Sequence, residues 1–234
     1  MKAAHMQSSF AGAAIALGAL AGFAAADFKE GFEGTMPGWD TKNVSSPATE
    51  RTWEVTDGVE RETFGAHKGT KYAFAADDHT GQHGTISSWL FSPVTVVNNA
   101  DKISFWTRTI AGSPFPDRMQ VLFSANGAST NTGPDEFSVG DFTTVVADIN
   151  FDFQVGGFPD QDWQQITALV LGLNGPVTGR FAFRYFVPGG GSAAERSNYI
   201  GLDDVAFFNA AVPTPGVLGL FGAGAAVGAR RRRR

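Results

Sequence analysis

The sequence predicts an all-β fold: a two-sheet antiparallel sandwich of the jelly-roll type, formed by a single domain. Short apolar runs alternate with polar residues at a period of two, and turn residues separate the runs. The 234 residues include 29 Gly, 11 Pro and 21 Phe, a composition that favours strands and turns. Between the two ends, no segment has the apolar spacing of an amphipathic helix. Many half-buried strands in one domain imply two packed sheets.

Six segments carry the strand pattern most clearly. In chain order they are residues 102–110, 118–124, 142–149, 163–173, 180–187 and 199–208. The first is expected to bury Ile103, Phe105, Thr107 and Thr109 on one face. The fourth places Leu169, Leu171 and Leu173 at a period of two. The fifth places Phe181, Phe183, Tyr185 and Val187 on one face.

Residues 1–26 have the three parts of a secretory signal peptide. Lys2 supplies the positive charge, residues 10–23 are uncharged and apolar, and Ala24 and Ala26 form a small-residue cleavage site. This pattern predicts export by the Sec machinery and cleavage by signal peptidase. The apolar stretch is too short for a comfortable membrane span. The alternative is that it forms an apolar N-terminal helix of the domain.

Residues 212–234 combine a proline-containing break, an apolar segment and a basic cluster. Pro213, Thr214 and Pro215 form the break, which stays extended because proline restricts the backbone. Residues 210–229 carry no charge over about the length that crosses a bilayer core. Transient membrane anchoring through this segment is therefore expected, with its basic end on the cytoplasmic side. The basic cluster consists of Arg230, Arg231, Arg232, Arg233 and Arg234.

These three parts resemble the PEP-CTERM sorting signal of bacterial surface proteins, with the letters VPTPG at 212–216 where VPEP is commonest. The resemblance implies that an exosortase, a membrane transpeptidase, cuts within 213–215 and removes the tail. It also implies localisation at the bacterial cell envelope, on the outer surface or in the extracellular matrix. The alternative is an ordinary tail anchor. A nucleic-acid-binding tail is disfavoured, because an apolar segment and no polar readers precede the arginines.

Residues 27–211 form the predicted domain, since no linker, charge run or repeat divides them. The whole chain has a net charge of −5, but the body holds 12 basic and all 23 acidic residues, a net charge of −11. This balance argues against a nucleic-acid partner. The absence of cysteine excludes disulfides, thiolate zinc sites, iron–sulfur clusters and cysteine nucleophiles.

The body contains an ordered series of short motifs. They are FKEGFE at 28–33, PGW at 37–39, SWLFSP at 88–93, ISFWTRT at 103–109, DRMQVLFS at 117–124, VGDFT at 139–143, IN at 149–150, GGFP at 156–159, Trp163, GRFAFRYFV at 179–187 and YIGLDDV at 199–205. In this order they resemble the choice-of-anchor J family of bacterial surface domains. The domain is also similar to the MAM and cleaved-adhesin jelly rolls, in which an opening Phe-Glu strand and a closing Ile-Asp-Asp strand recur. These resemblances imply a surface-anchored jelly roll but no established biochemical activity.

In MAM-like and sugar-binding jelly rolls, a buried cation often joins the opening and closing strands. Residue matching places Glu33, Asp203 and Asp204 at this position, with Asp77 or Asp78 as a further ligand. Calcium suits such carboxylates, because it takes six to eight hard oxygen ligands. The resemblance therefore implies a structural Ca²⁺ ion. The alternative is that these carboxylates are solvated turn residues or arginine partners.

Catalytic side chains are not evident. His79 and His83 have a spacing that suits zinc on a helix, but Thr80, Gly81 and Gly84 predict a loop, and no third ligand is obvious. Glycoside hydrolysis needs two carboxylates that flank the bond. The acidic residues that lie close together in the sequence form no such pattern: Asp27, Glu30, Glu33, Asp160 and Asp162. No catalytic residue is assigned, and the chain is predicted not to be an enzyme.

Cationic and aromatic side chains are the remaining candidates for ligand binding. Arg108, Arg118, Arg180 and Arg184 lie in aromatic strands, where they either bind acidic sugars or, as we favour, form ion pairs and cation–π contacts. The five tryptophans either form a sugar-stacking platform or, as we favour, pack in the core: Trp39, Trp53, Trp89, Trp106 and Trp163.

The function predicted from the sequence is that of an exported, envelope-sorted, non-enzymatic surface or extracellular-matrix protein. It is expected to bind polysaccharide or another surface protein. The alternatives are a secreted carbohydrate-active hydrolase and a purely structural surface domain. The ligand-binding residues are not identified at this stage.

Overall fold

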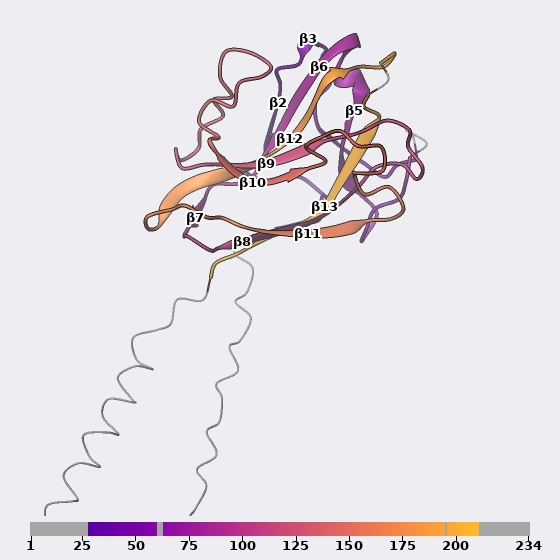
Figure 1. Cartoon of the computed structure of the whole chain (residues 1–234). Helices are drawn as coiled ribbons and strands as arrows, with labels where there is room; N and C mark the ends of the chain where they lie inside the picture. The colour runs from indigo at the N-terminus through magenta and orange to yellow at the C-terminus, as the bar shows by residue number, and fades with distance from the viewer. Residues whose placement is uncertain (1–27, 60–62, 195, 211–234) are drawn as a thin grey trace, which may run out of the picture.

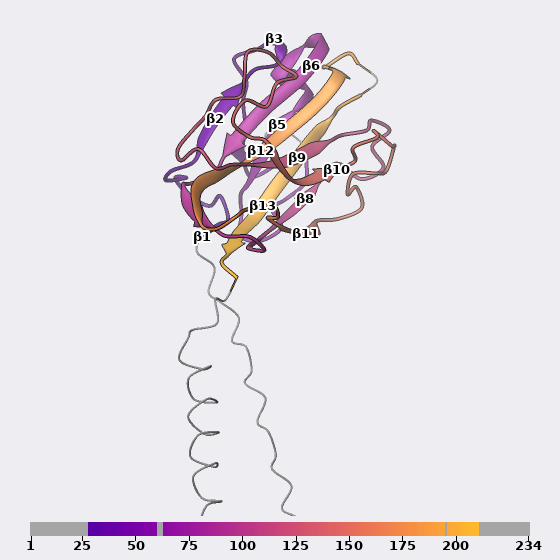
Figure 2. The ribbon, with the colours of Figure 1, turned by 60° about the vertical axis from the view of Figure 1, so that its left-hand side comes forward.

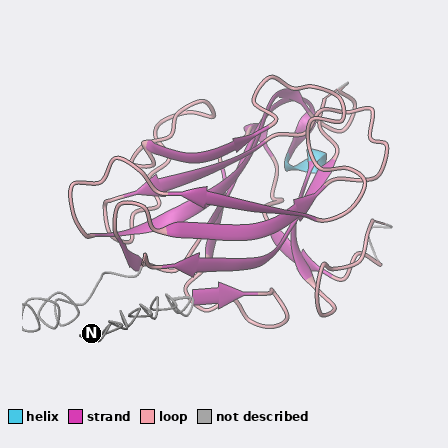
Figure 3. Ribbon diagram, turned by 60° about the horizontal axis from the view of Figure 1, so that its bottom comes forward, coloured by secondary structure: helices cyan, strands magenta, loops and turns pink. Residues whose placement is uncertain are grey.

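The computed structural model describes residues 28–59, 63–194 and 196–210. Its two antiparallel sheets form a sandwich of the jelly-roll type, which confirms the predicted all-β fold (Figure 1). Figure 3 shows that strands make up nearly all the regular structure. Among the described residues, the helical structure is one short 3₁₀ turn, η1 (Asp77–His79).

The two sheets contain six and seven strands. In the six-stranded sheet the order is β11 (Gln164–Leu169), β8 (Lys102–Arg108), β13 (Tyr199–Phe208), β5 (Tyr72–Ala76) and β4 (Glu54–Thr56), with β1 (Phe28–Glu30) paired to β13. In the seven-stranded sheet the order is β10 (Thr144–Ile149), β9 (Met119–Ser124), β12 (Val177–Gly190), β6 (Thr80–Phe91) and β2 (Asp40–Asn43), with β3 (Ser46–Ala48) paired to β6 and β7 (Thr95–Val97) paired to β12.

The core lies between the sheets and is built largely from aromatic rings. On β12, alternate side chains point inward, and Phe181 and Phe183 are fully buried. Phe183 packs edge-on against Phe105 of β8 with ring centroids 5.2 Å apart, and Phe181 contacts Phe207 of β13 at 5.3 Å. These contacts join the two sheets through strands far apart in the sequence.

The outer face of the seven-stranded sheet is also buried, because residues 125–143 fold over it. Phe142 from this segment contacts Trp89 and Phe91 of β6 at centroid distances of 5.5 and 5.2 Å. Leu122 and Ala182 complete this second apolar cluster. The strands β6, β9 and β12 are therefore largely buried on both faces.

Residues 63–71 cover the outer face of the six-stranded sheet in the same way. The Phe64 ring stacks on Tyr72 at 5.2 Å and meets Trp163 edge-on at 5.4 Å. Gly201 of β13 lies under these rings, and a Cβ atom there would come within 2.7 Å of both Phe64 and Trp163. Glycine at this position allows the aromatic cover to lie directly on the strand.

The six segments predicted as strands all contain strands, and the predicted buried face of 102–110 is buried. The prediction for 163–173 is wrong at its end, since β11 stops at Leu169. Leu169 and Leu171 are 46% and 58% exposed. The Val170 N–H donates to the Asp101 carbonyl at 2.9 Å and so turns the chain away from the edge of the sheet.

Both ends of the described chain leave the sandwich at the same place. Strand β1 pairs with the last part of β13, with Phe28 opposite Phe207, and Figures 1 and 2 show the first and last described residues at one end of the molecule. No helix in the described ranges has the length and apolarity needed to span a membrane. The predicted signal peptide (1–26) and sorting signal (212–234) lie outside the described residues.

Asp117 joins four segments at the opposite end of the strands. Its carboxylate accepts hydrogen bonds from the Tyr185 hydroxyl (2.6 Å), the Thr109 hydroxyl (2.7 Å) and the Asn198 N–H (2.8 Å). Its backbone carbonyl accepts a fourth bond from the Asn150 side-chain amide at 2.8 Å. Complete burial raises the pKa of Asp117 from 3.8 to about 6, although these hydrogen bonds oppose the shift.

This raised pKa predicts how stability depends on pH. Between about pH 4 and about pH 6 the folded protein binds more protons than the unfolded chain, so the free energy of unfolding falls as the pH rises. We expect Asp117→Asn to remove up to about 3 kcal/mol of this fall. Denaturant titrations of both proteins across this range measure the effect. Parallel pH profiles for wild type and Asp117→Asn would contradict it.

Candidate ligand-binding surface and cation site

Two of the three predicted cation ligands lie together, with a histidine that the sequence did not single out. Single ligand atoms of His67, Asp203 and Asp204 all lie within 4.8 Å of one another. His67 comes from the segment that covers the six-stranded sheet, and its ring stacks on Trp106 at 3.7 Å. Its Nδ1 atom lies 2.6 Å from Asp204 Oδ2. The cluster therefore connects the covering segment to β13.

Asp203 is fully buried in this cluster, and both of its carboxylate oxygens accept hydrogen bonds from backbone N–H groups. The N–H groups of His67 and Lys68 donate to Oδ2 at 2.9 and 3.2 Å, and the N–H of Asp204 donates to Oδ1 at 2.7 Å. Burial raises the pKa of Asp203 to about 6. Asp204 has a φ of 45°, a backbone conformation that non-glycine residues adopt rarely.

Glu33 binds the same covering segment by a different contact. Its carboxylate accepts bonds from the N–H groups of Thr70 (2.8 Å) and Lys71 (2.9 Å) and from the Thr70 hydroxyl (2.8 Å). Hydrogen bonds from Lys71 and Thr70 lower the pKa of Glu33. Glu33 is not part of the three-residue group found among the described residues. Residues from the beginning of the described chain (Glu33) and from its last strand (Asp203 and Asp204) therefore both bind residues 67–71 directly.

The donor set fits calcium incompletely. Two carboxylates and one imidazole nitrogen are fewer than the six to eight oxygen ligands that calcium takes, and the nitrogen suits zinc or another transition metal better. His67 also contacts both carboxylates directly: its backbone N–H donates to Asp203 Oδ2, and its Nδ1 lies 2.6 Å from Asp204 Oδ2.

The other predicted metal ligands lie elsewhere. Asp77 and Asp78 form the 3₁₀ turn, and Asp78 faces Arg51 at 3.7 Å. The expectation that His83 lies in a loop is wrong: β6 begins at Thr80, and His83 lies within it. Backbone pairing with β3 and β12 overrides the turn propensity of the glycines here.

The alternative of an arginine-rich sugar face is not supported, because three of these arginines are buried: Arg118, Arg180 and Arg184. Arg180 Nη2 lies 3.0 Å from Asp40 Oδ2. The Arg184 guanidinium lies 3.8 Å from the centre of the Phe186 ring. It also donates to the backbone carbonyl of Glu136, in the segment 125–143 that covers the seven-stranded sheet. The predicted ion-pair and cation–π packing is therefore confirmed.

The tryptophans follow the core interpretation as well. Trp39, Trp53 and Trp89 are buried, and Trp106 and Trp163 are half-buried beneath residues 63–71. The indole N–H of Trp53 donates to the Ser88 carbonyl at 3.1 Å, and that of Trp163 donates to the Gly65 carbonyl at 3.0 Å. These tryptophans do not line an exposed platform.

Phenylalanines form the exposed aromatic surface instead. Phe137 and Phe151 are 58% and 67% exposed. Phe137 meets Phe186 edge-on at 6.2 Å, and the Arg118 guanidinium lies 5.3 Å from Phe186, 4.8 Å from Phe151 and 5.4 Å from Phe153. We call these four rings and Arg118 the aromatic surface; Phe137 and Phe151 are its exposed rings, Phe153 is half-buried, and Phe186 and Arg118 lie buried beneath them. The two exposed rings are therefore the candidates for ligand contact in this part of the domain.

An ion pair between buried Arg118 and half-buried Asp148 fixes the guanidinium within the aromatic surface. Its Nε and Nη2 atoms donate to the two Asp148 oxygens at 2.8 and 2.6 Å. Gln120 donates to the same carboxylate at 3.0 Å. This bidentate geometry holds the guanidinium plane among the rings.

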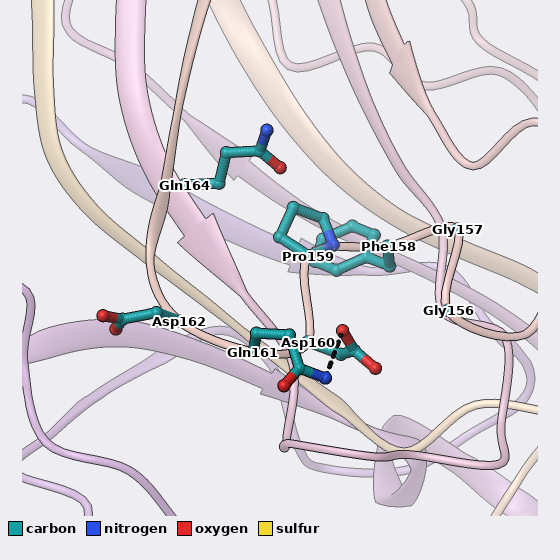
Figure 4. A pocket seen from close by; sticks show the side chains of 8 residues that line it. All are labelled: Gly156, Gly157, Phe158, Pro159, Asp160, Gln161, Asp162 and Gln164. Carbon is teal, nitrogen blue, oxygen red and sulfur yellow. Dashed lines mark hydrogen bonds between the residues drawn. The ribbon is translucent and has the colours of Figure 1, made fainter.

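The loop after β10 holds the exposed rings and continues into an open pocket. Asn150 accepts a hydrogen bond from the Gln154 N–H at 2.8 Å, and the Gly157 N–H donates to the Gln154 carbonyl at 3.0 Å. The next residues line a pocket of about 340 Å³ (Figure 4): Gly156, Gly157, Phe158, Pro159, Asp160, Gln161, Asp162 and Gln164. Two rings of the aromatic surface, Phe151 and Phe153, therefore lie on the same loop as this pocket.

Amide and carboxylate groups give the pocket its hydrogen-bonding capacity. Gln161 donates to Asp160 at 3.2 Å, and the carboxyl groups of Asp160 and Asp162 point in opposite directions in Figure 4. Asp162 instead accepts from the Trp163 N–H at 2.7 Å and faces Arg108 at 3.5 Å. This arrangement does not resemble two carboxylates that converge on one bond.

No protein-family model and no curated protein matches the sequence. Among solved structures, the chain resembles two cleaved adhesin domains of Lys-gingipain from Porphyromonas gingivalis W83. The K1 domain has 18% identity and a TM-score of 0.54 over 79% of this chain and 98% of that chain. The K3 domain has 19% identity and a TM-score of 0.52 over 80% and 100%. A xylan-binding domain from Paenibacillus barcinonensis has 15% identity and a TM-score of 0.44 over 81% and 98%. At these identities the likeness shows an adhesin-like jelly-roll fold.

Proposed function

We propose that the chain is an exported, envelope-sorted, non-catalytic surface protein whose domain binds polysaccharide. The observation that carries this proposal is the exposed aromatic surface beside the polar pocket. A sugar ring has an apolar C–H face that stacks on phenyl rings, while its hydroxyls need amide and carboxylate partners such as those of Gln161, Gln164 and Asp160. The polymer would lie across the rings and extend into the pocket.

The backbone of the loop supports a binding role. Phe153 has a φ of 54°, which is unusual for a bulky side chain. A hydrogen bond from its N–H to the Asn150 carbonyl at 3.1 Å holds this turn. Strained residues of this kind concentrate at ligand sites, where they present a side chain in advance of binding.

A hydrolase is the weaker alternative. Glycoside hydrolysis needs a carboxylic acid with a raised pKa in contact with the substrate. Within the described ranges, Asp117 and Asp203 have raised pKa values, but both side chains are fully buried and held by internal hydrogen bonds. The adhesin-like fold is also consistent with a binding domain.

Replacing one exposed ring should weaken polysaccharide binding. We expect Phe151→Ala to lower the affinity about tenfold for a polysaccharide selected on a glycan array, because removing one aromatic anchor costs about 1–2 kcal/mol. Titration calorimetry measures the change. Leu171→Ala is the control, since it removes a comparably exposed apolar side chain at the other end of β8. Equal affinities for wild type and Phe151→Ala would contradict the assignment of this surface.

The ends of the chain complete the proposal. The signal peptide would direct export, and the PEP-CTERM-type tail would present the domain to an exosortase, in keeping with a choice-of-anchor J protein. Intact-mass analysis of envelope and medium fractions tests this processing. We expect a mature form that begins at Asp27 and lacks the five terminal arginines. A surface form that keeps Arg230–Arg234 would contradict exosortase cleavage and favour an ordinary tail anchor.

The structural calcium ion stays a prediction that a melting experiment can decide. If an ion joins Asp204 and its neighbours to the covering segment, EDTA should lower the melting temperature by about 3 °C or more, and added calcium should restore it. The Asp204→Asn variant should show no response to EDTA. An unchanged wild-type midpoint in EDTA would exclude a stabilising ion.

A further inference from the structure

Four exposed aliphatic side chains lie at the end of the sandwich where the chain enters and leaves. Val94, Val96, Leu169 and Leu171 are between 44% and 58% exposed. Val96 belongs to β7, and Leu169 ends β11 opposite Lys102 at the start of β8. We call these four residues the anchor-end surface.

Hydrogen bonds around one turn bring the anchor-end surface together. The Ala100 N–H donates to the Val170 carbonyl at 2.7 Å, and the Val170 N–H donates to the Asp101 carbonyl at 2.9 Å. Leu169 and Leu171 therefore flank a residue bound directly to the turn that follows β7. Asn209, with its amide group turned, donates to Asp101 Oδ2 at 2.9 Å and to the Val96 carbonyl at 3.2 Å. The exposed side chains thus surround the last described residues.

The same end holds exposed positive charge. Lys29 of β1 lies opposite Ala206, and Lys102 lies opposite both Leu169 and Phe208. Both lysines are exposed. The neighbouring carboxylates make internal contacts: Glu30 accepts from the Phe32 N–H at 2.7 Å, and Asp101 accepts from the Ala210 N–H at 2.5 Å. Aliphatic side chains beside exposed lysines suit the interface of an anionic bilayer.

The course of the chain identifies the occupant of this surface. Beyond Ala210 the sequence continues for 24 residues, through the uncharged segment and the terminal arginines. Ala210, the last described residue, is still hydrogen-bonded to Asp101 within the domain. The described chain therefore stays attached to the anchor-end surface up to the point where the uncharged segment begins.

We infer that the anchor-end surface docks on the lipid bilayer while the chain is anchored, so that Val96, Leu169 and Leu171 enter the headgroup region. This inference rests on the proposed anchoring. Docking orients the domain, because β8 begins and β11 and β13 end at this surface, and Asp117 contacts Thr109 and Asn198 at the other ends of β8 and β13. The aromatic surface is then held away from the lipid.

Site-directed fluorescence tests this orientation, and the chain has no cysteine of its own. The full chain with Leu171→Cys, labelled with an environment-sensitive fluorophore, is reconstituted into vesicles of phosphatidylethanolamine with a minor share of phosphatidylglycerol. We expect acyl-chain-brominated lipids to quench this fluorophore about threefold. His83→Cys is the control, because His83 lies beyond the far end of β12, about 40 Å along the strand from Val177.

The outcomes separate docking from anchoring. Quenching at Leu171→Cys but not at His83→Cys supports docking, and adding Val96→Ser and Leu169→Ser should abolish most of it. A chain that floats with the vesicles but shows no quenching at either position overturns docking and leaves anchoring standing. A chain that does not float contradicts both. A blue-shifted, unquenched fluorophore at Leu171→Cys means that a second copy or another protein covers the surface, and it overturns lipid docking.

Discussion

The structure depends on the burial of β12 on both of its faces. The inward side chains Phe181 and Phe183 form the core between the sheets, and the outward side chains include Arg180 and Arg184. A charged side chain tolerates such burial only when its donors are satisfied. Arg184 donates to Ser87, Gln120 and the Glu136 carbonyl, and burial lowers its pKa to about 9. The covering segment 125–143 is thus part of the domain's packing and not a loose insertion.

The segments that cover the sheets limit where a ligand can bind. Residues 63–71 and 125–143 cover the central strands of the two outer faces, whereas Val145 of β10 and Thr167 of β11 stay exposed at the sheet edges. The candidate surfaces described above lie toward the ends of the strands. One end holds Phe151, Phe153 and the pocket on the loop after β10, and the other end holds the first and last described residues and exposed aliphatic side chains. The proposed binding site and the proposed anchor would therefore lie at opposite ends of the domain.

The candidate site was only partly predictable from the sequence. The repeated Asp-Asp at 203–204 marked the closing strand, but His67 lies more than 130 positions away and reaches Asp204 only because the covering segment folds back. Phe151 and Phe137 gave no signal, since aromatic residues in a Phe-rich chain are usually core. Their exposure follows from their position on loops, where neither sheet face is available to bury them.

The sequence by itself determined the all-β class and six of the thirteen described strands, because period-two alternation is a local property of the chain. The patterns of residues 1–26 and 212–234 can also be read from the sequence alone, because charge and apolar length do not depend on the fold. The tertiary structure decided which arginines and tryptophans were buried, and that β6 continues through His83. It also left Phe137 and Phe151 exposed. These features depend on which distant segments cover each sheet, and alternation within one strand contains no information about its covering partner.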